Sequence, residues 1–187
     1  MNILLKTIIV ATLTLFSASA CSKNNPEKKM EQKKILVVYF SATGNTKQVA
    51  IELANIVNAD ICEIEPVNPY TDADLNWHNS KSRSSIEMND TQARPEIKQV
   101  HIDVTEYDYI FLGYPIWWDL APRTINTFIE SNNIAGKTVI PFATSGGSSI
   151  NGSVATLKKT YPEINWKNGK LLNSASKKEI KTWCNDL

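Results

Sequence analysis

Residues 41–46 combine hydroxyl and amide side chains with one glycine, in the order Ser-Ala-Thr-Gly-Asn-Thr. An apolar run precedes this segment and a helical pattern follows it. Gly44 allows a tight turn and a close approach of the backbone to a ligand, and free N–H groups at a helix start favour a phosphate. The segment has neither the lysine of triphosphate loops nor the glycines of dinucleotide loops. It therefore predicts a monophosphate site, with a simple capped turn as the alternative.

Two later segments have residues suited to a flat ligand. Residues 113–118 read Gly-Tyr-Pro-Ile-Trp-Trp, and residues 144–148 read Thr-Ser-Gly-Gly-Ser. Adjacent tryptophans provide a flat apolar wall for a planar ring, and glycines let backbone N–H groups approach a ligand. The alternatives are an aromatic corner of the core for the first segment and a flexible loop for the second.

Each of these three segments follows a continuous apolar run, and such runs are typical of parallel strands that are buried on both faces. Alternating strands and helices predict an α/β fold with one parallel sheet. Ligands bind such sheets beyond the carboxyl ends of the strands, where all three segments would meet. The predicted strands are 35–40, 59–65, 109–114, 138–143 and 165–172, and the predicted helices around them are 48–57, 122–130, 154–161 and 177–184.

The connection from residue 66 to residue 106 is unusually long. A connection of this length is usually functional when it is ordered. Thr71 and Asp74 have the spacing of a capping box, which predicts a polar helix over 72–88. His78 lies within this helix, either as a proton donor near the ligand or as an ordinary surface residue.

The first 34 residues differ in character from the rest. Lys6, a short apolar run and a small-residue site predict a secretory signal peptide over residues 1–20. Cys21 ends an Ala-Ser-Ala-Cys sequence that resembles a bacterial lipobox, in which the cysteine carries the lipid. Residues 21–34 begin with Cys21 and are otherwise polar and lysine-rich, which predicts a flexible tether. The folded domain is predicted to span residues 35–187. We expect an exported protein, lipid-anchored at the bacterial cell envelope on its periplasmic or outer face; plain secretion or a membrane-tethered N-terminus is the alternative.

Charge and cysteine content exclude some classes of function. Residues 35–187 contain 14 basic and 17 acidic residues, which argues against a nucleic-acid-binding protein. Cys62 and Cys184 match no metal-ligand spacing, so no metal site is predicted. Cys62 lies in an apolar run, which indicates a buried free thiol, although two cysteines of an exported protein could also pair.

Residues 38–46, Val-Tyr-Phe-Ser-Ala-Thr-Gly-Asn-Thr, resemble the phosphate loop of flavodoxins. The resemblance extends over residues 35–183 and is strongest to small bacterial flavodoxin-like proteins that share the Tyr-Pro-Ile-Trp-Trp segment. It implies a three-layer sandwich with a five-stranded parallel sheet of strand order 2-1-3-4-5, and it implies FMN as the cofactor. By this resemblance the phosphate binds Ser41, Thr43, Gly44, Asn45 and Thr46, while the ring is flanked by Pro115, Ile116, Trp117, Trp118, Thr144, Ser145, Gly146 and Gly147.

Two departures from the flavodoxin pattern bear on function. Many electron-carrying flavodoxins have a glycine beside the flavin N5, but residues 115–119 contain none, and a change to positive φ is harder without glycine. Electron-carrying flavodoxins are also strongly acidic, and this chain is nearly neutral. Both departures favour an FMN-dependent oxidoreductase that passes electrons to a quinone or a similar acceptor.

Two alternative functions remain open. One is a one-electron carrier between protein partners, and the other is a non-catalytic FMN-binding lipoprotein. The expected partners are a redox partner protein or a small-molecule electron donor or acceptor, with no nucleic acid. Contact with a membrane is expected through the lipid anchor only.

Overall fold

The computed structural model describes residues 33–173 and 175–187. The predicted signal peptide, Cys21 and most of the predicted tether lie outside the described residues. None of the helices within the described ranges is long and apolar enough to cross a membrane.

A parallel sheet forms the centre of the domain, in the strand order β2-β1-β3-β4-β5. Its residues are almost wholly buried in β1, β3 and β4, as expected for apolar strands covered on both faces. The predicted sheet and its strand order are confirmed. The strands are β1 (Ile35–Tyr39), β2 (Asp60–Glu63), β3 (Tyr109–Pro115), β4 (Thr138–Thr144) and β5 (Asn165–Trp166).

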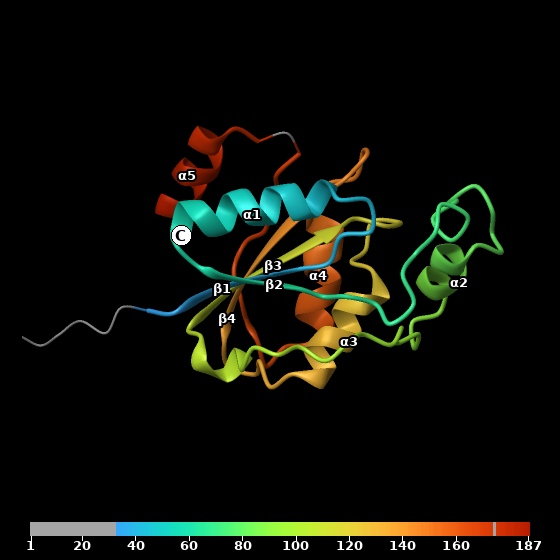
Figure 1. Ribbon diagram of the computed structural model, residues 1–187, viewed down its shortest axis with the longest axis horizontal. Coiled ribbons are helices and arrows are strands. Elements are labelled where there is room, and N and C mark those ends of the chain that lie inside the picture. Colours follow the sequence, from blue (N-terminus) through green and yellow to red (C-terminus); the bar gives the residue numbers. More distant parts are fainter. Residues whose placement is uncertain (1–32, 174) are drawn as a thin grey trace, which may run out of the picture. The chain divides into compact units, whose positions relative to one another are not determined.

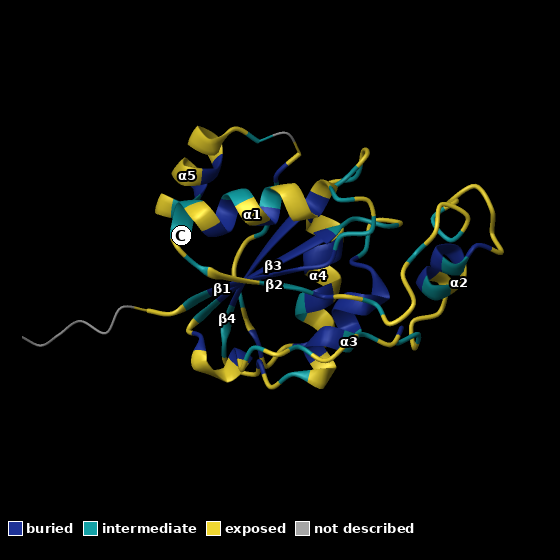
Figure 2. Ribbon diagram, viewed as in Figure 1, coloured by how far each residue is buried: buried dark blue, intermediate teal, exposed yellow. Residues whose placement is uncertain are grey.

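Helices cover both faces of the sheet, which gives the predicted three layers (Figure 1). Leu36 and Val38 of β1 belong to a core cluster with residues of α3 and α4, while Val37 and Tyr39 belong to a second cluster with residues of α1 and α5. This alternation follows the period of two along a strand. Figure 2 shows the buried sides of these helices turned towards the sheet. The helices are α1 (Asn45–Val57), α3 (Arg123–Ser131), α4 (Asn151–Thr160) and α5 (Lys177–Asn185).

The last predicted strand, 165–172, is split in two. After β5 the chain leaves the ladder and returns as β6 (Lys170–Leu171), and both segments pair with β4. Gly169 lies in the interruption, where a Cβ atom would come within 2.8 Å of the Ile150 side chain. The interruption therefore follows from close packing against the segment that begins α4, which the local apolar pattern does not encode.

The predicted polar helix over 72–88 is wrong for residues 72–82, and only residues 83–88 of it are helical. Thr71 and Asp74 do form reciprocal capping bonds, with Asp74 N–H donating to Thr71 Oγ1 at 3.2 Å. Turns follow instead of a helix, because this polar stretch has no apolar face to bury. We call the long connection between β2 and β3, residues 66–106, the crossover. Its helix is α2 (Arg83–Asn89), capped by Ser82, and a short 3-10 turn, η1 (Val104–Glu106), precedes β3.

The two cysteines of the described domain are free thiols. Cys62 of β2 packs against the cluster on the α3 and α4 side, whereas Cys184 of α5 packs against the cluster on the α1 and α5 side. The sheet therefore separates them. Burial raises the pKa of the Cys62 thiol and raises the pKa of Cys184 to about 11.

Candidate functional site

The loop between β1 and α1 presents free backbone donors. Gly44 adopts a left-handed conformation, with φ of 87°, and precedes the first turn of α1. Ser41 Oγ accepts hydrogen bonds from the N–H groups of Gly44, at 3.1 Å, and Lys47, at 3.2 Å. The N–H groups of Asn45 and Thr46 donate to no other atom of the described residues. Two donors at a helix start, near its positive dipole end, are suited to an anion.

The side chains predicted to bind the phosphate divide into two groups. Thr43 and Asn45 are exposed and line a cavity. Thr46 is buried, and its hydroxyl lies 2.8 Å from the hydroxyl of Thr144 at the end of β4. Ser41 and Thr46 thus hold the loop, whereas Thr43 and Asn45 face the space beside it.

Lys47, the basic residue next to this loop, is already paired. Its Nζ lies 2.7 Å from Glu63 of β2, and that carboxylate also accepts from the Tyr39 hydroxyl at 2.9 Å. An anion at the loop would therefore be bound by backbone N–H groups and hydroxyls rather than by a free lysine.

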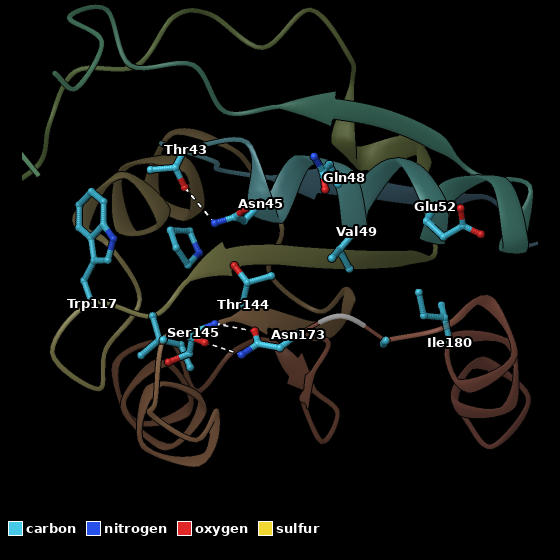
Figure 3. A pocket seen from close by; sticks show the side chains of 14 residues that line it. Thr43, Asn45, Gln48, Val49, Glu52, Trp117, Thr144, Ser145, Asn173 and Ile180 are labelled. Carbon is cyan, nitrogen blue, oxygen red and sulfur yellow. Dashed lines mark hydrogen bonds between the residues drawn. The ribbon is translucent and has the colours of Figure 1, made fainter. Parts of the chain in front are cut away.

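The first cavity, of about 610 Å³, runs from this loop along α1 (Figure 3). Eight of the predicted site residues line it, from all three of the predicted loops. Asn173, after β6, accepts from the Ser145 N–H at 2.8 Å and also donates to the Ser145 carbonyl, so it orients that loop. The lining residues that the sequence did not predict are Gln48, Val49, Glu52, Asn173, Ala175 and Ile180.

A second cavity, of about 580 Å³, adjoins the first. Six residues line both cavities, so the two are contiguous: Thr43, Pro115, Ile116, Trp117, Ser145 and Gly146. Trp118 and Gly147 line the second alone. The long crossover also reaches this cavity through Leu75, Trp77 and Ser84, and none of the described residues that line it is charged.

The adjacent tryptophans have different surroundings. Trp117 packs edge-on against Phe40, with ring centroids 5.7 Å apart, and against Tyr70, at 5.2 Å. Trp118 is 46% exposed and lines the second cavity. Of the two, Trp118 is therefore the tryptophan left free to stack on a flat ligand.

A tight turn places Trp118. The N–H of Trp117 donates to the Leu120 carbonyl at 3.0 Å and the reverse bond is 2.9 Å. Between them, Trp118 and Asp119 have φ values of 47° and 60°. Positive φ at two adjacent non-glycine residues is strained. Residues 115–119, which contain no glycine, thus already adopt the positive φ that was expected to be difficult without one.

Residues of the crossover pack against Trp117 and hold it in place. Tyr70 donates to the carboxylate of Glu87, and Arg83 donates to the same carboxylate at 2.7 Å while its guanidinium lies over the Tyr70 ring. Burial and the Glu87 hydrogen bond raise the pKa of Tyr70, so its hydroxyl stays protonated. His78 stacks on Trp77, with ring centroids 3.5 Å apart, and lines neither cavity.

The lining residues that the sequence did not predict differ in how far a local pattern could have revealed them. Trp77 is a large aromatic residue in a polar stretch, and that contrast could have marked it. Ser84 and Asn173 carry no local signal, because they reach the site only through the path of the crossover and the interruption of the last strand.

Comparisons with known proteins agree with this architecture. A protein-family profile described as flavodoxin matches residues 34–187. The crystal structure of a candidate flavoprotein from Bacteroides eggerthii DSM 20697 is 57% identical, covers 83% of this chain and 98% of its own, and has a TM-score of 0.81. A candidate flavoprotein from Bacteroides uniformis ATCC 8492 is 53% identical, with 82% and 98% coverage and a TM-score of 0.80.

A more distant relative was solved with its cofactor. The flavoprotein from Lactobacillus acidophilus NCFM, in complex with FMN, is 25% identical, covers 79% of this chain and 99% of its own, and has a TM-score of 0.65. Among curated proteins, no match is found. The family profile spans the described domain and the Bacteroides structures share more than half of its residues, so the chain belongs to the flavodoxin family.

Proposed function

We propose that this protein binds FMN and is a flavin-dependent oxidoreductase. The observation that carries the proposal is the continuity of the two cavities with the helix start. Thr43 and Asn45 line the first cavity beside the two free N–H groups, Thr43 also lines the second cavity, and Trp118 lines the second cavity. The FMN complex of the Lactobacillus acidophilus relative supports the choice of ligand.

The donors and walls fit the parts of FMN. The Asn45 and Thr46 N–H groups with the Thr43 hydroxyl would hold the phosphate, and the uncharged second cavity with its tryptophans would hold the ring. FMN supplies the capacity to accept and release one or two electrons. The chain would position the ring through this lining and would exclude water from the face that packs against it.

The proposed reaction partner is a small molecule, a quinone or a similar acceptor. With the ring in the second cavity, the acceptor would approach it past Trp77 and Trp118, which are 66% and 46% exposed, and the described lining there has no charged residue. Such a surface favours a flat, uncharged molecule, because desolvating a charge there would be unfavourable. The same exposed tryptophans also favour the second candidate, a carrier that docks on a partner protein.

Titrations separate these proposals. The cofactor-free chain is titrated with FMN and, as the matched control, with riboflavin, which lacks the phosphate. Binding of FMN at least 100-fold tighter than riboflavin supports the phosphate assignment, and equal binding rejects it. Anaerobic reduction then tests the reaction: reoxidation by a naphthoquinone supports the oxidoreductase, and a loaded protein that stays reduced in its presence contradicts it.

We further propose that the protein is exported and lipid-anchored through Cys21, with residues 22–34 as the tether. The Ala-Ser-Ala-Cys sequence after a short apolar run supports this proposal. Growth of expressing bacteria with a labelled fatty acid would label the full-length protein and leave the Cys21→Ser variant unlabelled. Equal labelling of the two would contradict it.

A further inference from the structure

Ser84 of α2 has a buried hydroxyl without a hydrogen-bond partner. Within the described residues only two buried side-chain polar atoms share this state, Ser84 Oγ and Thr124 Oγ1. Buried polar groups are nearly always hydrogen-bonded, so each exception calls for an explanation. Ser84 lines the second cavity, whereas Thr124 lines neither of the two cavities of the site. This difference points to a ligand atom as the missing partner of Ser84.

The backbone around Ser84 is held firmly. The Ser84 N–H donates to the Asp74 carbonyl at 3.0 Å, which ties α2 to the preceding turns of the crossover. Ser82 caps the helix through its side chain, which accepts from the Ser85 N–H. The hydroxyl of Ser84 is therefore presented by an ordered turn, next to the segment that carries Trp77.

The other end of α2 is anchored to the sheet layers. Arg123, at the start of α3, donates to the carbonyls of Glu87 at 3.3 Å and Met88 at 3.0 Å. Glu87 in turn binds Tyr70, whose ring packs against Trp117. The helix that carries Ser84 is thus fixed to the loop that forms the opposite wall of the cavity.

The chemistry of the cavity limits what the partner can be. Its described lining is uncharged and rich in aromatic residues, which favours a flat ring. A serine hydroxyl can donate to a carbonyl oxygen or a ring nitrogen, and the isoalloxazine edge carries both. We propose that Ser84 Oγ donates a hydrogen bond to a carbonyl oxygen on the edge of the FMN ring, and that Trp77 covers the ring from the same crossover.

This inference rests on the proposed function and adds a role for the crossover. Reduction of the flavin increases the negative charge on its carbonyl oxygens, so a donor to one of them stabilises the reduced form more than the oxidised form. Loss of the hydroxyl should therefore weaken FMN binding and lower the reduction potential together.

The experiment compares Ser84→Ala with Thr124→Val, which removes the other unpartnered buried hydroxyl away from the cavity. We expect Ser84→Ala to bind FMN about tenfold more weakly. We also expect about a tenfold smaller preference for reduced flavin, which lowers the two-electron potential by about 30 mV. Thr124→Val should match the wild type in affinity and potential. Ser84→Cys, which keeps the shape with a weaker donor, should behave like Ser84→Ala and guards against a folding defect.

The outcomes separate this inference from the proposed function. If the wild type takes up no FMN, both fail. If the wild type binds FMN and Ser84→Ala keeps its affinity and potential, the Ser84 assignment alone is overturned. The assignment also fails if Thr124→Val changes both quantities as much as Ser84→Ala, because the effect would then follow from buried packing in general.

Discussion

The hydroxyl of Thr46 lies 2.8 Å from the hydroxyl of Thr144, and both residues are buried. The first belongs to the start of α1 and the second to the end of β4. One hydrogen bond therefore joins the loop proposed to hold the phosphate to the loop proposed to lie along the ring.

Thr46→Val should destabilise the domain by about 1–3 kcal/mol, because it leaves the Thr144 hydroxyl buried without a partner. Urea unfolding measures this change. Adding Thr144→Val removes the orphaned group, so the double variant should be more stable than the sum of the two single effects. Strict additivity of the two substitutions would show that the hydroxyls are not coupled.

Thr43→Ala should weaken FMN binding about tenfold or more, since a hydrogen bond to a charged group contributes about 1.5–3 kcal/mol. Combining it with Thr46→Ala should weaken binding severely, because the loop also loses its tie to β4. Fluorescence titration measures both effects. Thr156→Ala, on the exposed face of α4, is the control and should bind FMN like the wild type. Unchanged affinity in the double variant would remove the phosphate assignment.

Trp118→Ala and Trp117→Ala should have opposite profiles. Trp118 is a half-exposed wall of the second cavity, so its loss should brighten flavin fluorescence and leave the free energy of unfolding nearly unchanged. Trp117 packs on Phe40 and Tyr70, so its loss should destabilise the domain by about 2–4 kcal/mol. Thermal unfolding and flavin emission together check this division. An unchanged emission in both variants would contradict a stacking role for either ring.

Cys184 should react slowly with iodoacetamide until the pH is well above 9, because burial raises its pKa to about 11 and the thiolate is the reactive form. The same shift in pKa sets how the free energy of unfolding depends on pH. The unfolded thiol, with its ordinary pKa near 9.0, ionises first as the pH rises. Its contribution to stability is therefore present below pH 9 and is lost between pH 9 and about 11. Rates of alkylation measured against pH, with Cys184→Ala as the reference, test this. Rapid alkylation of Cys184 at pH 8 in the folded protein would contradict it.

The sequence alone determined the sheet and the edge at which the site forms. The apolar runs before residues 41, 115 and 144 are long enough to specify buried parallel strands, and consecutive crossovers then bring their carboxyl ends together. The glycine and hydroxyl pattern of residues 41–46 marked the helix start as the proposed anion end of the site. These features are local in the chain, so a period or a spacing reveals them.

Only the tertiary structure decided which of these side chains pack against other residues and which face the cavities. Thr46 turned towards Thr144 and Trp117 towards Phe40 and Tyr70, which left Thr43 and Trp118 facing the cavities. The approach of Ser84 depends on the path of the crossover. Each of these contacts joins residues far apart in the chain, and packing between layers sets them, because no local preference distinguishes one threonine or one tryptophan from its neighbour.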